Sequence, residues 1–94
     1  MIYVYILASR KNGAIYVGKT TDLLRRLEQH RTGTASSHTK KYRIFTLVYF
    51  EAHETLEQAF AREQKLKRWK RDWKDALIEE FNPDWSDISQ DVPL

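Results

Sequence analysis

Three kinds of side chain that can act on a phosphodiester follow one another along this chain. Tyr5 and Tyr16 lie eleven residues apart on apolar segments, Arg26 and His30 come next, and Glu63 lies further along. A phenol or an imidazole can move protons, a guanidinium can grip a phosphate through two hydrogen bonds, and a lone carboxylate can hold Mg²⁺. As a set, these residues indicate a small domain that cuts phosphodiester bonds.

Three apolar segments are typical of strands. Residues 2–8 and 14–19 are rich in Tyr, Val and Ile, and the Asn12-Gly13 turn between them predicts an antiparallel hairpin. Arg43 to Phe50 is apolar on both faces and is predicted as a third strand. We expect residues 33–42 to form a polar loop.

Helical patterns fill the rest of the chain. A first helix begins after Thr20-Thr21-Asp22 and ends before Gly33, a second runs from about Thr55 to Arg71, and a third covers about 72–81. Asn82-Pro83 ends the third helix, since proline disfavours helical geometry in the residue before it. The predicted buried residues of these helices are Leu23, Leu24, Leu27, Leu56, Ala59, Phe60, Leu66, Trp73, Ala76, Leu77 and Phe81.

Glu63 falls inside the apolar stripe of the second helix. A carboxylate in such a place must be paired, protonated or bound to a cation, because an isolated buried charge is very costly. One interpretation is a salt bridge to Arg26 or to a nearby lysine; the other is a metal-binding or catalytic role. Arg26 and His30 share one edge of the first helix, where they form either a phosphate-facing edge or a solvated flank.

The aromatic residues also allow two interpretations. Tyr5 and Tyr16 can be core residues, and a role as base requires a nearby cation to lower a pKa that is normally near 10. Tyr3 is assigned a structural role only. The ten residues from Lys65 to Lys74 hold six basic residues, and the two tryptophans among them are interpreted as core, with the basic side as a binding face.

Composition limits the remaining function classes. Ninety-four residues make one domain, and the absence of cysteine excludes a Cys₄ zinc module, a thiol nucleophile and a disulfide framework. The net charge is +3, but the three acids after Pro83 are matched by no base, so residues 1–83 carry 16 basic against 10 acidic residues, or +6. We therefore expect a polyanionic partner, a domain over 1–83 and a flexible acidic tail over 84–94. With no membrane span or signal layout, we expect a cytoplasmic protein that does not bind membranes.

Two tripeptides carry a family resemblance. Tyr3-Val4-Tyr5 and Tyr16-Val17-Gly18 resemble the paired motifs of the GIY-YIG nuclease domain. The family's arginine, histidine, metal-binding glutamate and late asparagine correspond to Arg26, His30, Glu63 and Asn82. The resemblance covers about residues 1–85 and is greatest to the small stand-alone bacterial members, the UPF0213-like proteins. Tyr3 replaces the glycine of the first motif, and Val4 and Val17 replace isoleucines.

The resemblance implies a fold of the α/β class (α+β type), with a three-stranded antiparallel sheet flanked by helices. It also implies a metal-dependent endonuclease in which Glu63 holds Mg²⁺ or Mn²⁺ and Arg26 grips the scissile phosphate. Tyr5 or Tyr16 orients or deprotonates the attacking water, His30 assists, and Asn82 supports the site or merely ends its helix. The residues expected to contact nucleic acid are Lys19, Arg26, Lys40, Lys41, Lys67, Arg68, Lys70 and Arg71.

Three functions compete at this point. The first is an endonuclease acting on DNA, including branched or flapped forms, as a monomer that depends on a protein partner for specificity. The second is a nucleic-acid-binding module that keeps the fold without catalysis. The third, a protein-interaction domain, leaves the grouping of Arg26, His30 and Glu63 unexplained.

Overall fold

A three-stranded antiparallel sheet forms the centre of the protein. The computed structural model describes residues 1–93. Its strands are β1 (Ile2–Ala8), β2 (Ile15–Thr20) and β3 (Thr46–His53), in the order β2-β1-β3. The predicted hairpin joins β1 to β2, with Asn12 in the left-handed region at φ 60°. The expected sheet is thus confirmed, and β2 and β3 are its two edges.

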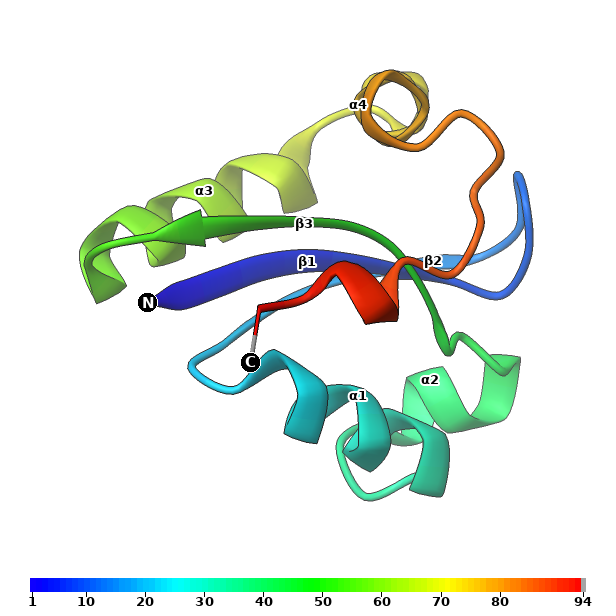
Figure 1. The fold of residues 1–94 in the computed structure, drawn as a ribbon. Helices are drawn as coiled ribbons and strands as arrows, with labels where there is room; N and C mark the ends of the chain where they lie inside the picture. The colour runs from blue at the N-terminus through cyan, green and yellow to red at the C-terminus, as the bar shows by residue number, and fades with distance from the viewer. Residues whose placement is uncertain (94) are drawn as a thin grey trace.

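Four α-helices and one short 3₁₀ helix surround the sheet. They are α1 (Leu23–Thr32), α2 (Ser37–Tyr42), α3 (Leu56–Arg68), α4 (Arg71–Phe81) and η1 (Ser89–Asp91). In Figure 1, α3 and α4 lie over one face of the sheet, whereas α1, α2 and the C-terminal segment lie over the other. Among the described residues, no helix is both long enough and apolar enough to cross a membrane.

The alternation of side chains along β1 gives the protein a core on each face of the sheet. Val4 and Ile6 pack with the residues of α3 and α4, whereas Tyr5 and Leu7 pack with Leu23 and other residues from α1 and β3. Because successive residues of a strand point to opposite faces, β1 is buried on both sides. Tyr5 therefore lies on the face of the sheet that α1 covers.

The C-terminal segment, expected as an acidic tail, packs against the sheet. Trp85 and Val92 are buried, in the cores on opposite faces of the sheet, and the Ile88 N–H donates to the Leu47 carbonyl at 2.9 Å. Apolar residues spaced along this acidic segment bury their surface while its carboxylates stay outside, and that burial holds the segment against the sheet. Residues 84–93 thus contribute to the cores on both faces of the sheet, the flexibility expected of the tail stays a prediction, and Leu94 lies outside the described residues.

Two expectations about secondary structure were wrong. Residues 37–42, expected as loop, form α2, which is capped by Ser36 accepting from the Thr39 N–H and ended by Arg43 in the left-handed region. The third strand begins at Thr46 rather than at Arg43. The side-chain capping bond supplies a helix start that the polar composition of this stretch concealed.

The apolar stripes of the last two long helices are narrower than predicted. Only Ala59, Glu63 and Leu66 of α3 are buried, at positions i, i+4 and i+7, because a three-stranded sheet offers a narrow surface to a helix. Several apolar residues that were expected inside are exposed, namely Leu24, Leu56, Phe60, Trp73 and Phe81.

Candidate active site

A chain of hydrogen bonds links β1, α1 and α2 beneath the sheet. The Tyr5 hydroxyl lies 2.9 Å from His30 Nε2, and His30 Nδ1 lies 3.0 Å from Thr39 Oγ1. Thr39 Oγ1 in turn donates to the Ser36 carbonyl at 3.0 Å. Tyr5, His30 and Thr39 are each at most 1% exposed, so water does not compete for these contacts. His30, expected on a phosphate-facing edge or a solvated flank of the first helix, is therefore buried.

The direction of these bonds fixes the proton positions. A carbonyl oxygen only accepts, so the single hydroxyl hydrogen of Thr39 is used on Ser36. Thr39 Oγ1 must then accept from His30, which places the imidazole proton on Nδ1. His30 Nε2 is left with a lone pair and accepts the Tyr5 hydroxyl proton. The structure thus presents a neutral imidazole that is ready to take a proton from a phenol.

Burial tunes both members of this pair. Burial, with smaller contributions from Tyr16 and Glu63, raises the pKa of Tyr5 well above its usual value, although the charge of Arg26 acts in the opposite direction. Burial and the Arg26 charge lower the pKa of His30. At neutral pH the tyrosine therefore keeps its proton and the histidine stays neutral.

Tyr16 and Gly18 enclose the Tyr5 hydroxyl from β2. The Tyr16 ring packs edge-on against the His30 ring, with centroids 5.1 Å apart. Gly18 pairs directly with Tyr5, and a Cβ at this position would lie 2.6 Å from the Tyr5 hydroxyl oxygen. The glycine of the second motif is needed because any side chain there would displace the Tyr5 hydroxyl. Tyr16 is the more accessible phenol, being half-buried.

Arg26 supplies an unused hydrogen-bond donor, and its charge acts on both Tyr5 and His30. Among residues 1–93, its Nε is the one buried side-chain nitrogen or oxygen without a hydrogen-bond partner. The side chain lines a recess of about 150 Å³ together with Thr20, Thr21, Asp22, Arg25 and Gln29. A guanidinium with an unpaired N–H suits an anionic oxygen, because leaving that donor unpaired costs free energy.

Glu63 approaches β2 from α3, on the other face of the sheet. Its carboxylate is 5% exposed and pairs with Lys19 Nζ at 3.0 Å and with Lys67 Nζ at 3.4 Å. The salt bridge anticipated for this position exists, and it uses lysines rather than Arg26. The charge of Glu63 still contributes to the raised pKa of Tyr5. The carboxylate and the phenol therefore interact electrostatically, although they approach from opposite faces of the sheet.

The residues around Glu63 fit a metal ion only in a limited way. Within the described part of the chain, no group of three or more His, Cys, Asp or Glu side chains gathers at one point. Mg²⁺ is often held by one or two carboxylates while water and substrate phosphate complete its shell, so a single glutamate is sufficient. For Glu63 to hold a cation, Lys19 and Lys67 must first turn away from it.

The side chain of Asn82 uses its hydrogen bonds on β3 and on the segment that follows α4. Its Nδ2 donates to the carbonyls of Val48 and Ser86 at 3.1 and 2.8 Å, and its Oδ1 accepts from the Ser86 N–H and hydroxyl. These four bonds hold the C-terminal end of α4 to β3 and to the segment that follows. The geometry therefore gives Asn82 a structural task, without a hydrogen bond to the other predicted site residues.

The predicted nucleic-acid contacts fall into two groups. Lys19 and Lys67 pair with Glu63, and Arg71 bonds to Asp75 and to the Gly13 carbonyl. Lys40, Lys41, Arg68 and Lys70 are exposed, and Arg26, the remaining member of the set, lines the recess described above.

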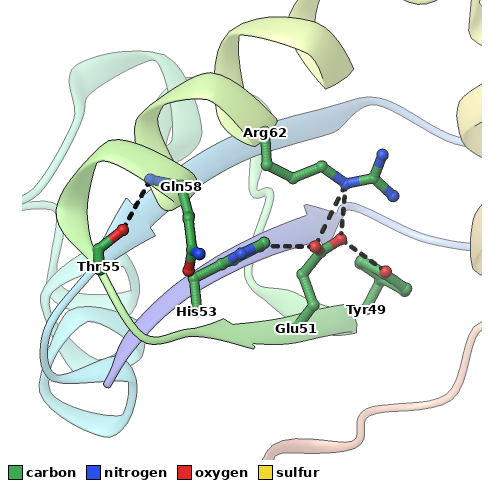
Figure 2. A network of polar contacts seen from close by, with 6 residues as sticks. All are labelled: Tyr49, Glu51, His53, Thr55, Gln58 and Arg62. Atoms are coloured by element: carbon green, nitrogen blue, oxygen red, sulfur yellow. Dashed lines mark hydrogen bonds and ion pairs between the residues drawn. The ribbon is translucent and has the colours of Figure 1, made fainter.

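A second polar cluster lies at the opposite edge of the sheet. Figure 2 shows Glu51 of β3 accepting from Tyr49, His53 and Arg62, at 2.7, 2.7 and 3.0 Å. Burial alone would raise the pKa of Glu51, but these hydrogen bonds outweigh it and hold the pKa below its usual value. Burial and the bond to Glu51 raise the pKa of Tyr49 to about 12. The bond from Arg62 to Glu51 ties α3 to β3 and fixes the rotation of the helix about its axis. Because Glu63 is the next residue of α3, the same bond fixes the direction in which Glu63 points.

Sequence reasoning missed Thr39 and Ser36. Both lie in a stretch that was predicted as loop, and no local pattern pairs Thr39 with a histidine nine residues earlier in the chain. The polar stretch Ser36-Ser37 ahead of Thr39 was the one available signal, since serine is a common helix N-cap.

Comparison with known proteins places the chain in a family. The GIY-YIG catalytic domain matches residues 1–76. A UPF0213 protein of Bacillus pumilus is 37% identical over 79 residues, covering 84% of this chain and 80% of the relative. One from Haloquadratum walsbyi is 36% identical over 78 residues, covering 83% of this chain and 86% of the relative. The solution NMR structure of a UPF0213 protein from Bacillus halodurans is similar with a TM-score of 0.58 and 32% identity, over 96% of each chain.

The match extends over both tyrosine motifs, Arg26, His30 and Glu63, and it ends before Asn82. By these similarities the chain belongs to the GIY-YIG catalytic domain family, a nuclease family, among relatives named UPF0213 proteins.

Proposed function

We propose that this protein is a divalent-metal-dependent endonuclease that hydrolyses DNA phosphodiester bonds. The observation that carries the proposal is the Tyr5–His30–Thr39 chain beside the unpaired Arg26 donor. A buried phenol aimed at the lone pair of a neutral imidazole is a route for a proton, and a pure binding surface has no use for one.

In the proposed reaction, Arg26 holds the scissile phosphate and offsets the charge that develops on it. The attacking water gives a proton to the Tyr5 oxygen while the Tyr5 proton passes to His30 Nε2. The water oxygen bonds to phosphorus as the bond to the leaving oxygen breaks. The leaving oxygen takes a proton from solvent, and His30 afterwards returns its extra proton to solvent through Tyr5. Thr39 keeps the other imidazole proton on Nδ1 throughout and stabilises the imidazolium that forms.

Tyr16 closes the site beside His30 and orients the water through its more accessible hydroxyl. Glu63 would hold Mg²⁺ or Mn²⁺, which neutralises charge on the phosphate and on the leaving oxygen when bound. Lys19 then becomes free to contact the DNA backbone. The set proposed to act in catalysis is therefore Tyr5, Tyr16, Arg26, His30 and Glu63, with Asn82 holding the scaffold.

The test is cleavage of labelled DNA by the purified protein. Duplex, flap, branched and single-stranded substrates are incubated with Mg²⁺, Mn²⁺ or EDTA, alongside Glu63→Gln and Tyr16→Phe. Glu57→Gln, an exposed change on the same helix, is the matched control. We expect cleavage that needs metal, survives Glu57→Gln and is lost in Glu63→Gln. Cleavage that persists in EDTA or in Glu63→Gln contradicts the proposal.

One observation favours a second function. Lys19 and Lys67 already pair with the Glu63 carboxylate, which therefore needs no metal ion to balance its charge. This pairing is expected of a nucleic-acid-binding module that has the fold but no catalytic activity. Metal-independent DNA binding without cleavage on any substrate would support that function. We further propose a cytoplasmic monomer that takes its specificity from a protein partner.

A further inference from the structure

The outward side of α2 combines aromatic and basic side chains. Tyr42 is 50% exposed, and its ring packs at a tilt against the His38 ring, with centroids 5.0 Å apart. Lys41 Nζ lies 5.4 Å from the centre of the Tyr42 ring. Lys40 and Arg43 are exposed at the same end of the helix. A large aromatic ring is thus held in solvent among cations.

The segment of the chain around α2 carries charge of one sign. Residues 29–50 contain Arg31, Lys40, Lys41 and Arg43 and include neither Asp nor Glu. Arg31 pairs with Asp87 at 3.5 Å, whereas the other three cations make no ion pair within residues 1–93. Such a surface attracts a polyanion.

The helix that carries this surface also contributes a residue to the candidate active site. Thr39 of α2 bonds directly to His30, and Tyr42 follows three residues later on the same helix. Residues three apart on a helix are neighbours, with Cβ atoms about 5–6 Å apart. The exposed ring of Tyr42 is therefore one helical turn from the residue that orients the catalytic imidazole.

We propose that α2 binds unpaired nucleotides of the DNA strand next to the scissile phosphate. One base stacks on the Tyr42 ring, and the neighbouring phosphates contact Lys40, Lys41 and Arg43. The partner is single-stranded because the base pairs of a duplex already stack on one another, whereas an unpaired base has a free face for an aromatic ring. The inference rests on the proposed function for the choice of DNA.

Charge separates Tyr42 from Trp73, another exposed aromatic side chain of similar accessibility. Trp73 of α4 is 56% exposed, and its helix carries four acids (Asp72, Asp75, Glu79 and Glu80) against Arg71 and Lys74, or −2. A helix of net negative charge attracts phosphates less than the segment around α2, so Trp73 serves as the control for Tyr42.

The experiment measures DNA binding in EDTA, so that the result does not depend on cleavage. Fluorescence anisotropy compares a duplex carrying a five-nucleotide overhang with a blunt duplex, using wild type, Tyr42→Ala, Tyr42→Phe and Trp73→Ala. Circular dichroism establishes that each variant is folded. We expect Tyr42→Ala to weaken binding to the overhang by about tenfold, with less than about a twofold change on the blunt duplex. Tyr42→Phe and Trp73→Ala should bind like wild type.

Salt dependence tests the cations separately. Replacing Lys40 and Lys41 together by glutamine should reduce the slope of log K against log salt, by about 0.7 for each single-strand phosphate that the protein no longer neutralises. Equal effects of Tyr42→Ala on both DNAs, or none on either, would overturn the inference. A protein that binds overhangs through Tyr42 but never cuts would retain the inference and refute the nuclease.

Discussion

Replacing Thr39 by valine tests the proton relay with the smallest change of shape. Valine keeps the branched side chain but removes the hydroxyl that accepts from His30 and donates to the Ser36 carbonyl. The Ser36 carbonyl still accepts from the Lys40 N–H at 3.2 Å, so only the His30 Nδ1–H is left without a partner. An unpaired buried donor costs about 1–3 kcal/mol, which is the expected loss in the free energy of unfolding.

The histidine has one way to avoid that cost. It can move its proton from Nδ1 to Nε2, but the Nε2–H then faces Tyr5 and the phenol can no longer donate. A cost of about 1.4 kcal/mol changes an equilibrium constant by a factor of ten. The fraction of His30 that keeps its proton on Nδ1 should fall accordingly, and the cleavage rate should fall with it by about tenfold or more. Thr39→Ser restores the hydroxyl and should restore the rate.

Two measurements decide the outcome. The ¹⁵N chemical shifts of the His30 imidazole report which nitrogen carries the proton, and cleavage of the preferred DNA at fixed pH reports the rate. Thr32→Val, an exposed change on α1, controls for the loss of a hydroxyl as such. If Thr39→Val leaves His30 protonated on Nδ1 and cuts at the wild-type rate, Thr39 does not position the imidazole and the reasoning is refuted.

Three other predictions follow from the same structure. Gly18→Ala should reduce the cleavage rate and destabilise the fold by about 1–3 kcal/mol, because its Cβ would overlap the Tyr5 hydroxyl; unchanged kinetics would contradict this. Glu51→Gln should cost about 1–3 kcal/mol in urea unfolding, since it weakens three hydrogen bonds, whereas the exposed Glu57→Gln should cost little. Because the pKa of His30 is lowered from 6.5, the imidazole stays neutral in the folded state as pH falls to 6.5; both cleavage rate and stability should decline only below that pH, and a rate already falling at pH 7.5 would argue against His30 as proton acceptor.

Local sequence patterns were enough to predict most of the elements. The hairpin turn, the helix that starts after Asp22 and the end of α4 depend on contacts between residues close in the chain, and each lies within a few residues of its expected place. The helix at Ser37–Tyr42 escaped prediction because six residues are too few for a periodic pattern. The packing of residues 84–93 escaped because it depends on the two surfaces of a sheet that forms elsewhere.

The sequence by itself determined which side chains are present for chemistry and on which elements they lie: two phenols on neighbouring strands, an arginine and a histidine four residues apart on a helix, and one glutamate in an apolar stripe. Only the tertiary structure decided their partners. It turned His30 inward to Tyr5, supplied Thr39 from a helix that was not predicted, and gave Glu63 two lysines instead of Arg26. The physical reason is that helix and strand patterns are local, whereas a buried polar group takes whatever partner the packing of distant elements brings within about 3 Å.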